Sequence, residues 1–143
     1  MPGFRRKKAT LILLVVFALV VLLYPSQMTV VPQWRVRVVD ESGTPLANTG
    51  VRETWQHYDA ESTGHEEDLV TDHEGYVTFP ERKIRAPLAV RIVGRIVNKV
   101  VPHRGSGPDA FVIVLAPDYD TWSNNSALPG QPLPTHIVVK KNR

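Results

Sequence analysis

The sequence predicts an all-β protein, an antiparallel Greek-key β-sandwich preceded by one N-terminal hydrophobic helix. Two phrases in the middle of the chain, residues 38–48 and 71–79, indicate the sandwich, because each has a short apolar run, a polar turn with glycine and a second run. A third observation is the uncharged apolar run at residues 11–24, which follows four consecutive cations and predicts the helix.

The strands are expected to number about six to eight, with turns at close intervals. The run at 110–115 is continuously apolar and is expected to be the most buried strand. Outside the N-terminal segment we see no helical period, so the β-branched runs on either side of Gly94 and Arg95 are interpreted as strands. The expected strands are residues 33–40, 51–57, 68–71, 76–79, 88–93, 96–101, 110–115 and 136–139.

The composition excludes several classes of protein. The chain has 143 residues and no cysteine, which excludes disulfides, thiolate metal sites and cysteine catalysis. The net charge is +3, but Arg5, Arg6, Lys7 and Lys8 supply four of the 17 cations. The remaining 13 cations face 14 acids, so the folded part lacks the basic face that nucleic-acid binding requires.

The N-terminal run is predicted to be an uncleaved transmembrane signal anchor at residues 9–25. The alternative, a cleaved signal peptide, needs small residues before the cleavage site, and the large ring of Tyr24 does not suit that position. Cations favour the cytoplasmic side of a membrane, so the domain would face outward. We therefore expect a single-pass protein with the lipid bilayer as a partner, in a bacterial inner membrane facing the periplasm, because exported eukaryotic domains are often disulfide-rich.

These observations divide the chain into five segments. They are a cytoplasmic basic segment (1–8), the anchor (9–25), an extended linker (26–33), the β-sandwich (34–116) and a loop-rich C-terminal tail with an edge strand (117–143).

Residues 34–101 resemble the carboxypeptidase regulatory-like domain, a transthyretin-like sandwich that shares its turn phrases with related Ig-like sandwiches. The first family phrase, Asp-x-x-Gly-x-Pro-Leu with a later valine, is filled by Asp40, Gly43, Pro45, Leu46 and Val51. The second, built on Thr-Asp-x-x-Gly, is filled by Thr71, Asp72, Gly75, Tyr76, Val77 and Phe79.

The resemblance implies a module without catalytic residues. In metallocarboxypeptidases this domain sits beside the zinc domain and does no chemistry, so we expect no enzyme activity, cofactor or metal. The motif residues are expected to build turns: Asp40 and Asp72 accept turn N–H groups, Gly43 and Gly75 adopt conformations that a Cβ would obstruct, and Pro45 fixes φ.

Two other groups of residues have chemistry that the turns do not use. Histidines and carboxylates gather in residues 65–74, but their spacing matches no loop with fixed cation ligands, so a solvated acidic loop is the simpler interpretation and cation binding stays open. Tyr119 and Trp122 lie in the tail and are candidates for stacking on a sugar ring.

The sequence thus predicts a membrane-anchored, extracytoplasmic β-sandwich for protein interaction or structural support, with an envelope protein as partner. A carbohydrate- or cell-wall-binding module on the same scaffold is the alternative. An exposed apolar patch or an unpaired strand edge would favour the protein partner. Aromatic side chains in a groove would favour the sugar.

Overall fold

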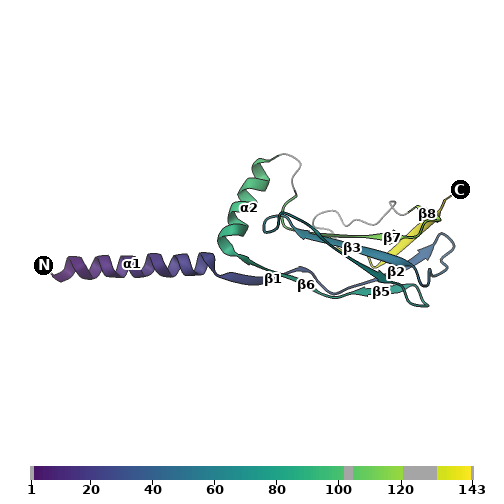
Figure 1. The fold of residues 1–143 in the computed structure, drawn as a ribbon, viewed down its shortest axis with the longest axis horizontal. Helices are drawn as coiled ribbons and strands as arrows, with labels where there is room; N and C mark the ends of the chain where they lie inside the picture. Colours follow the sequence, from purple (N-terminus) through teal and green to yellow (C-terminus); the bar gives the residue numbers. More distant parts are fainter. Residues whose placement is uncertain (1, 102–104, 121–131, 143) are drawn as a thin grey trace.

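The computed structural model describes residues 2–101, 105–120 and 132–142, and it is a mainly β chain with two helices (Figure 1). The prediction of a β protein built from short strands is confirmed. The elements in chain order are α1 (Pro2–Leu23), β1 (Pro25–Val31), β2 (Trp34–Asp40), β3 (Gly50–His57), β4 (His65–Val70), β5 (Tyr76–Phe79), β6 (Arg82–Pro87), α2 (Leu88–Val100), β7 (Pro108–Leu115), β8 (Tyr119–Asp120) and β9 (His136–Lys141).

The described strands form two larger sheets and one two-stranded ribbon. The strand orders are β5-β2-β9-β8 and β4-β3-β7, and β1 pairs with β6. The pairs are antiparallel except β2 with β9, which run parallel. The prediction of a purely antiparallel architecture is therefore wrong at this pair. Most of the chain lies between these two strands, so no tight turn forces them to be antiparallel.

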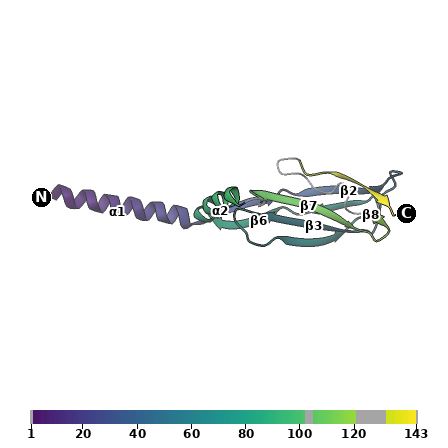
Figure 2. The same cartoon turned by 90° about the horizontal axis from the view of Figure 1, so that it is seen from above.

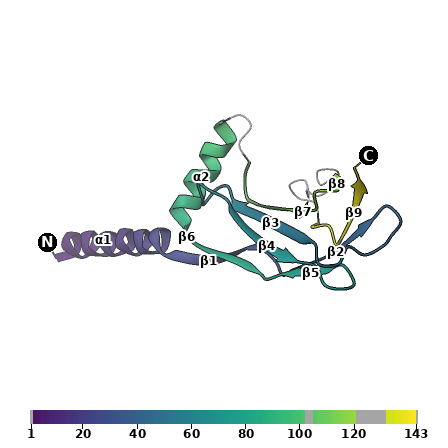
Figure 3. The same ribbon diagram turned by 45° about the vertical axis from the view of Figure 1, so that its right-hand side comes forward.

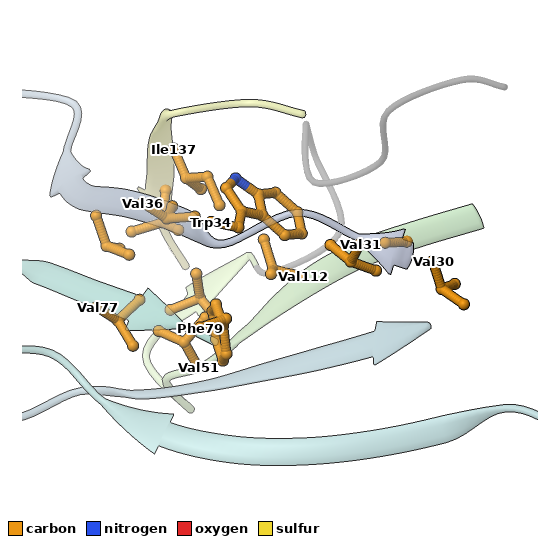
Figure 4. Close-up of a cluster of buried hydrophobic side chains, with 13 residues drawn as sticks. Val30, Val31, Trp34, Val36, Val51, Val77, Phe79, Val112 and Ile137 are labelled. Carbon is orange, nitrogen blue, oxygen red and sulfur yellow. The ribbon is translucent and has the colours of Figure 1, made fainter. Parts of the chain in front are cut away.

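Side chains from both larger sheets and from the end of β1 share one hydrophobic core (Figure 4). The ring centroids of Trp34 and Phe79 lie 6.3 Å apart, and Trp34 Nε1 donates a hydrogen bond of 2.7 Å to the carbonyl of Pro134. Strand β7 alternates between buried and less buried residues, with Leu115 41% exposed, so it is not the most buried strand that was expected; β2 buries more of its residues. Val112 and Val114 of β7 are fully buried. Each such side chain stabilises the fold by about 1.5–3 kcal/mol.

Residues 26–33 were expected to be a linker, but most of them form strand β1. Its last two residues, Val30 and Val31, are buried in the core. Pro25 starts the strand and Pro32 follows its end, where the missing N–H groups leave the ladder with β6 intact. Prolines at the two limits of a strand therefore gave the appearance of a linker.

The β-branched runs at 88–93 and 96–101 are not two strands but parts of one helix, α2. Figures 1 and 3 show this helix standing at the end of the β body, close to the end of α1. Arg91, Arg95 and Lys99 are spaced by four residues and so lie along one helical face. The β preference of valine and isoleucine is modest, and tertiary contacts override it here.

The predicted membrane anchor at residues 9–25 is wrong. No helix in the described part of the chain is long and apolar enough to cross a membrane. The uncharged part of α1 runs from residue 9 to Leu23, about 22 Å at 1.5 Å per residue, against roughly 30 Å of hydrocarbon. The chain then turns into β1, and α1 points away from the β body (Figure 2). The predicted single-pass topology, in a bacterial inner membrane facing the periplasm, depended on this anchor and is therefore wrong as well.

The end of the chain contributes strand β9, which lies inside its sheet between β2 and β8. It was expected to be an edge strand of a tail. Ile137 and Val139 are fully buried, so this segment is part of the core.

Asp40 and Asp72 each close a turn with one carboxylate oxygen. Asp40 Oδ1 accepts the N–H groups of Ser42 at 2.8 Å and Thr44 at 2.9 Å. Asp72 Oδ1 accepts two N–H groups of its own turn in the same way, each at 2.9 Å. Hydrogen bonds lower the pKa of both carboxyls. The largest contribution comes from the Ser42 hydroxyl for Asp40 and from the Tyr76 N–H for Asp72.

Gly43 and Gly75 occupy the left-handed region in these turns, with φ of +84° and +79°. A Cβ on Gly43 would meet nothing within 4 Å. A Cβ on Gly75 would lie 2.5 Å from the carbonyl oxygen of Val38 and 3.1 Å from Pro45 Cβ. The second turn therefore packs directly on both sides of the first turn, against Val38 of β2 and against Pro45.

Gly75→Ala should destabilise the protein more than Gly43→Ala. Both substitutions strain a positive-φ residue by about 1–2 kcal/mol, but only Gly75→Ala adds a clash, at about 1–3 kcal/mol more. Urea unfolding of the full chain measures both losses. Equal losses would contradict the packing of the two turns.

Candidate functional site

A cavity of about 240 Å³ lies where α2 meets the end of the β body. Its walls come from α2, β1, the end of β3 and the start of β7. The polar part of the lining is supplied by His57, Asp59, Arg91 and Arg95, and Met28 supplies apolar surface. The fold thus gathers an imidazole, a carboxylate and two guanidinium side chains from two separate parts of the chain, residues 57–59 and helix α2.

Helix α2 is held against the turn after β3 by a narrow stripe of two residues. A Cβ on Gly94 would lie 2.0 Å from the carbonyl oxygen of Asp59, so glycine alone permits this approach. One turn later, the buried Asn98 donates from Nδ2 to the carbonyl of Tyr58 at 2.9 Å and to Asp59 Oδ1 at 3.0 Å. These contacts decide which face of α2 meets the cavity and which meets solvent.

Asp59 is 7% exposed and its carboxylate is well supplied with donors. Besides Asn98, it accepts from Ser106 Oγ at 3.0 Å and from the N–H of Gly107 at 3.1 Å. Burial raises the pKa of Asp59, but these hydrogen bonds outweigh burial and lower that pKa overall. The carboxylate therefore ties α2 and the segment before β7 to the turn after β3.

His57, the last residue of β3, is 5% exposed and lines the cavity. Its backbone N–H donates to Glu61 Oε2 at 2.9 Å. Its ring atom Nδ1 has no hydrogen-bond partner among the described residues. A buried polar atom without a hydrogen bond lowers the stability of a fold by about 1–3 kcal/mol. The presence of an unpaired Nδ1 here therefore needs an explanation.

The two guanidinium groups have no carboxylate partner in the part of the chain that the structure describes. Arg91 Nη1 lies 3.5 Å from Ser26 Oγ and 3.8 Å from Met28 Sδ, and neither neutral atom balances its charge. Among the described residues no ion pair joins Arg91 or Arg95 to an acid. The lining thus carries two cations against the single carboxylate of Asp59.

His57, Asp59 and Ser106 are the residue types of a catalytic triad, but they are not connected as one. In a triad the serine hydroxyl is hydrogen-bonded to the histidine, and the acid orients that histidine. Here Ser106 Oγ donates to the carboxylate of Asp59 instead. The arrangement is therefore suited to holding a ligand by charge and hydrogen bonds.

A second polar cluster joins β3, β4 and β6. Glu53 is fully buried, with Oε2 2.7 Å from Arg82 Nη2, and Oε1 has no hydrogen-bond partner among the described residues. Arg82 also pairs with Glu67 and lies 4.2 Å from the ring centroid of Trp55. Burial raises the pKa of Glu53, and Arg82 opposes that shift. This cluster connects the ribbon to the β3 sheet.

The prediction of a solvated acidic loop at 65–74 holds only for its end: residues 65–70 form β4, and the exposed residues 72–74 lie in the turn that follows. Arg52 pairs with Asp68 at 2.7 Å and with Glu66 at 3.2 Å. In the part of the chain that the structure describes, no group of three or more His, Cys, Asp or Glu side chains is placed to hold a metal ion.

Of the predicted stacking pair, Tyr119 and Trp122, the structure describes only Tyr119. Tyr119 lies in β8 and packs against the hydrophobic core. Trp122 lies outside the described residues. No observation on the described residues therefore favours the sugar-binding alternative.

Sequence reasoning did not single out the four polar residues of the cavity. The signal that was available is the spacing of Arg91, Arg95 and Lys99, which predicts a helix with a basic face. Nothing local relates that helix to His57 or Asp59, because the contact between them is made by tertiary structure.

No protein-family model matches the chain, and no curated protein matches it. Among solved structures, 3-chlorocatechol 1,2-dioxygenase from Rhodococcus opacus 1CP is similar over 82% of this chain, with a TM-score of 0.44 and 14% identity. The match spans 62% of that protein's chain. A likeness of this degree carries no argument about fold or function.

Asp59→Asn should destabilise the protein by about 1–3 kcal/mol at neutral pH, because the new amide places N–H groups opposite existing donors. The folded pKa of Asp59 lies below its unfolded value of 3.8, so its contribution is present above that pH and is lost as pH falls through the folded pKa. Urea unfolding at neutral and acid pH should show a smaller acid loss in the variant. The exposed Asp118→Asn serves as the control, and an equal effect of both substitutions would contradict the role of Asp59.

Arg82→Met should cost about 3–5 kcal/mol at neutral pH, because it leaves the charge of Glu53 buried without a partner. Without Arg82 the folded pKa of Glu53 rises further above its unfolded value. The lost stability should therefore return as pH falls through that raised pKa and Glu53 takes up a proton. Chemical unfolding across this pH range tests it, and adding Glu53→Leu should restore much of the stability at neutral pH. A deficit that does not change with pH would refute the account.

Proposed function

We propose that this protein is a non-catalytic β-rich module that works by binding another protein. The observation that carries the proposal is the exposed apolar face of α2, whose side chains are 41–76% exposed. A helix on a globular domain normally turns such a face toward the core. The apolar face of α2 consists of Val90, Val93, Ile96, Val97 and Val100, and the exposed Ile92 beside it also lines the cavity.

The helical period explains why this face is left uncovered. At 3.6 residues per turn, Gly94 and Asn98 form one stripe, and they make the contact with the turn after β3. The cations lie on one side of that stripe. The apolar face takes up the rest of the circumference, away from the β body. A contiguous apolar surface on a helix marks an interaction site.

A shallow hollow of about 410 Å³ continues this face toward the body. It is bounded by Val90 and Val93 on α2 and by Ala60 and Ser62 after β3. An apolar side chain of a partner has an anchor point here, and buried anchors of this kind dominate interface energies.

The composition of the apolar face favours a protein over a lipid surface. Helices that lie in membrane interfaces carry Trp, Phe and Leu on their apolar side. This face has only valine and isoleucine. Their β-branched side chains are stiff and lose little conformational entropy when a partner buries them.

The cations beside the apolar face indicate the chemistry of the partner. Arg91, Arg95 and Lys99 form an adjoining basic row along α2. The partner we propose has an apolar groove with carboxylates along one rim, which receives α2 as helix-in-groove complexes do.

We also propose that the scaffold is a transthyretin-like Greek-key sandwich of the carboxypeptidase regulatory-like kind. The two motif turns, which pack together at Gly75 and Pro45, and the core shared by two sheets support this. Helix α2 departs from the expected all-strand pattern. It is then an addition to a binding scaffold, placed at the end of the matched stretch.

Val93→Asp combined with Val97→Asp should weaken partner binding at least about thirtyfold, the loss typical of interface hot spots. A photo-cross-linker at Ile96 in the native host identifies the partner, and the purified partner is titrated against the full chain by calorimetry. Both valines are exposed, so the variant should fold, which circular dichroism checks.

The matched control is Val70→Asp, which alters a valine of β4 that is 62% exposed but remote from α2. It should leave the affinity unchanged. Equal losses from both sites would overturn the proposal. So would binding of the wild-type chain to anionic phospholipid vesicles, lost in the double variant, with no purified protein partner that binds.

A further inference from the structure

We propose that the cavity beneath α2 binds a small organic anion carrying a carboxylate or phosphate group. Arg91 and Arg95 would hold the negative charge, and His57 Nδ1 would bind a polar atom at the other end of the ligand. This inference goes beyond the binding of a protein partner. It uses Arg91 and Arg95 of the basic row, which the proposed partner would also approach, and it does not use the apolar face of α2.

The charge of the lining gives the sign of the ligand. The guanidinium groups of Arg91 and Arg95 border the cavity, and no carboxylate of the described residues pairs with them. A guanidinium presents several N–H donors in a planar fork that matches the geometry of carboxylate and phosphate groups. With two cations against one carboxylate, this lining favours an anionic ligand.

Asp59 does not oppose an anion strongly, because its oxygens are already engaged. They accept hydrogen bonds from Asn98 Nδ2, Ser106 Oγ and the N–H of Gly107. These donors offset part of the negative charge that the ligand would meet. The role of Asp59 here is to keep α2 at the distance that forms the cavity.

The ring of His57 supplies a second, independent indication of a ligand. It is 5% exposed, it lines the cavity, and Nδ1 has no hydrogen-bond partner among the described residues. Nδ1 is shielded from solvent, so the imidazole ring has to turn toward the cavity before a ligand can hydrogen-bond to this atom. A ligand bound in that way would recover the cost of leaving Nδ1 unpaired.

The volume restricts the size of the ligand. At about 240 Å³ the cavity is smaller than the roughly 300–1,000 Å³ of sites that take drug-sized molecules. It corresponds to about eight water molecules at roughly 30 Å³ each. A short carboxylic acid or a small phosphorylated compound fits this space, and a nucleotide does not.

The test is a titration of the isotope-labelled full chain followed by NMR, in a non-ionic detergent because α1 exposes apolar side chains. The probes are sodium phosphate and sodium succinate, with glycerol as the neutral control and ionic strength held constant by sodium chloride. Saturable shifts of the His57 ring and of the Arg91 and Arg95 side-chain N–H signals are expected. Saturation by phosphate alone indicates a phosphorylated ligand, and saturation by succinate alone indicates a carboxylate.

Arg91→Gln and Arg95→Gln should each weaken the binding of the saturating anion about tenfold or more. Arg85→Gln is the matched control, because Arg85 is an exposed cation of β6, outside the cavity lining, and it should leave the affinity unchanged. The proposal is overturned if neither anion gives a saturable shift, or if all three variants weaken binding equally. Because Val93→Asp with Val97→Asp alters the opposite side of α2, it should leave this titration unchanged, so the two proposals fail independently.

Discussion

A missing side chain at Gly94 lets helix α2 come into contact with the backbone of the β body. A Cβ added at position 94 would lie only 2.0 Å from the carbonyl oxygen of Asp59. Any residue other than glycine would therefore have to move the helix. Asn98 then fixes the rotation of the helix about its own axis by hydrogen bonds to Tyr58 and Asp59. The cavity and the directions of the basic row and the apolar face of α2 all depend on this contact through Gly94 and Asn98.

The contact between α2 and the β body is narrow, so it buries little apolar surface of the helix. A domain that buried the valines of α2 would gain about 1.5–3 kcal/mol for each of them. Here the contact is made by a glycine and an amide, so most of that apolar surface stays in water. The exposed apolar surface lowers the stability of the isolated chain. Burial of the same surface by a partner would favour binding. The same helix can then serve two ligands of different chemistry, a protein on its apolar face and a small anion beside its cations.

Several elements were predictable because their signals are local. Alternating or continuous apolar residues predict β2, β3 and β7, and the Asp and Gly positions predict the turns around Asp40 and Asp72. The rest depends on contacts that are distant in sequence. The valines and isoleucines of α2 favour strands locally, whereas the spacing of Arg91, Arg95 and Lys99 is helical, and the contact through Gly94 and Asn98 supports the helix. The parallel pairing of β9 and the convergence of His57 with Arg91 have no local signal, so the cavity could not be predicted.

The measurement that tests the account most directly is amide hydrogen exchange along α2 in Gly94→Ala, compared with the unaltered chain. Alanine favours an isolated helix over glycine by about 1 kcal/mol, so helix propensity alone predicts slower exchange in the variant. If α2 is held through Gly94, the reverse is expected: the added Cβ displaces α2 from Asp59, and the amides of α2 lose protection while those of β3 and β7 keep theirs. Unchanged or increased protection of α2 would contradict the claim that the helix is seated through Gly94.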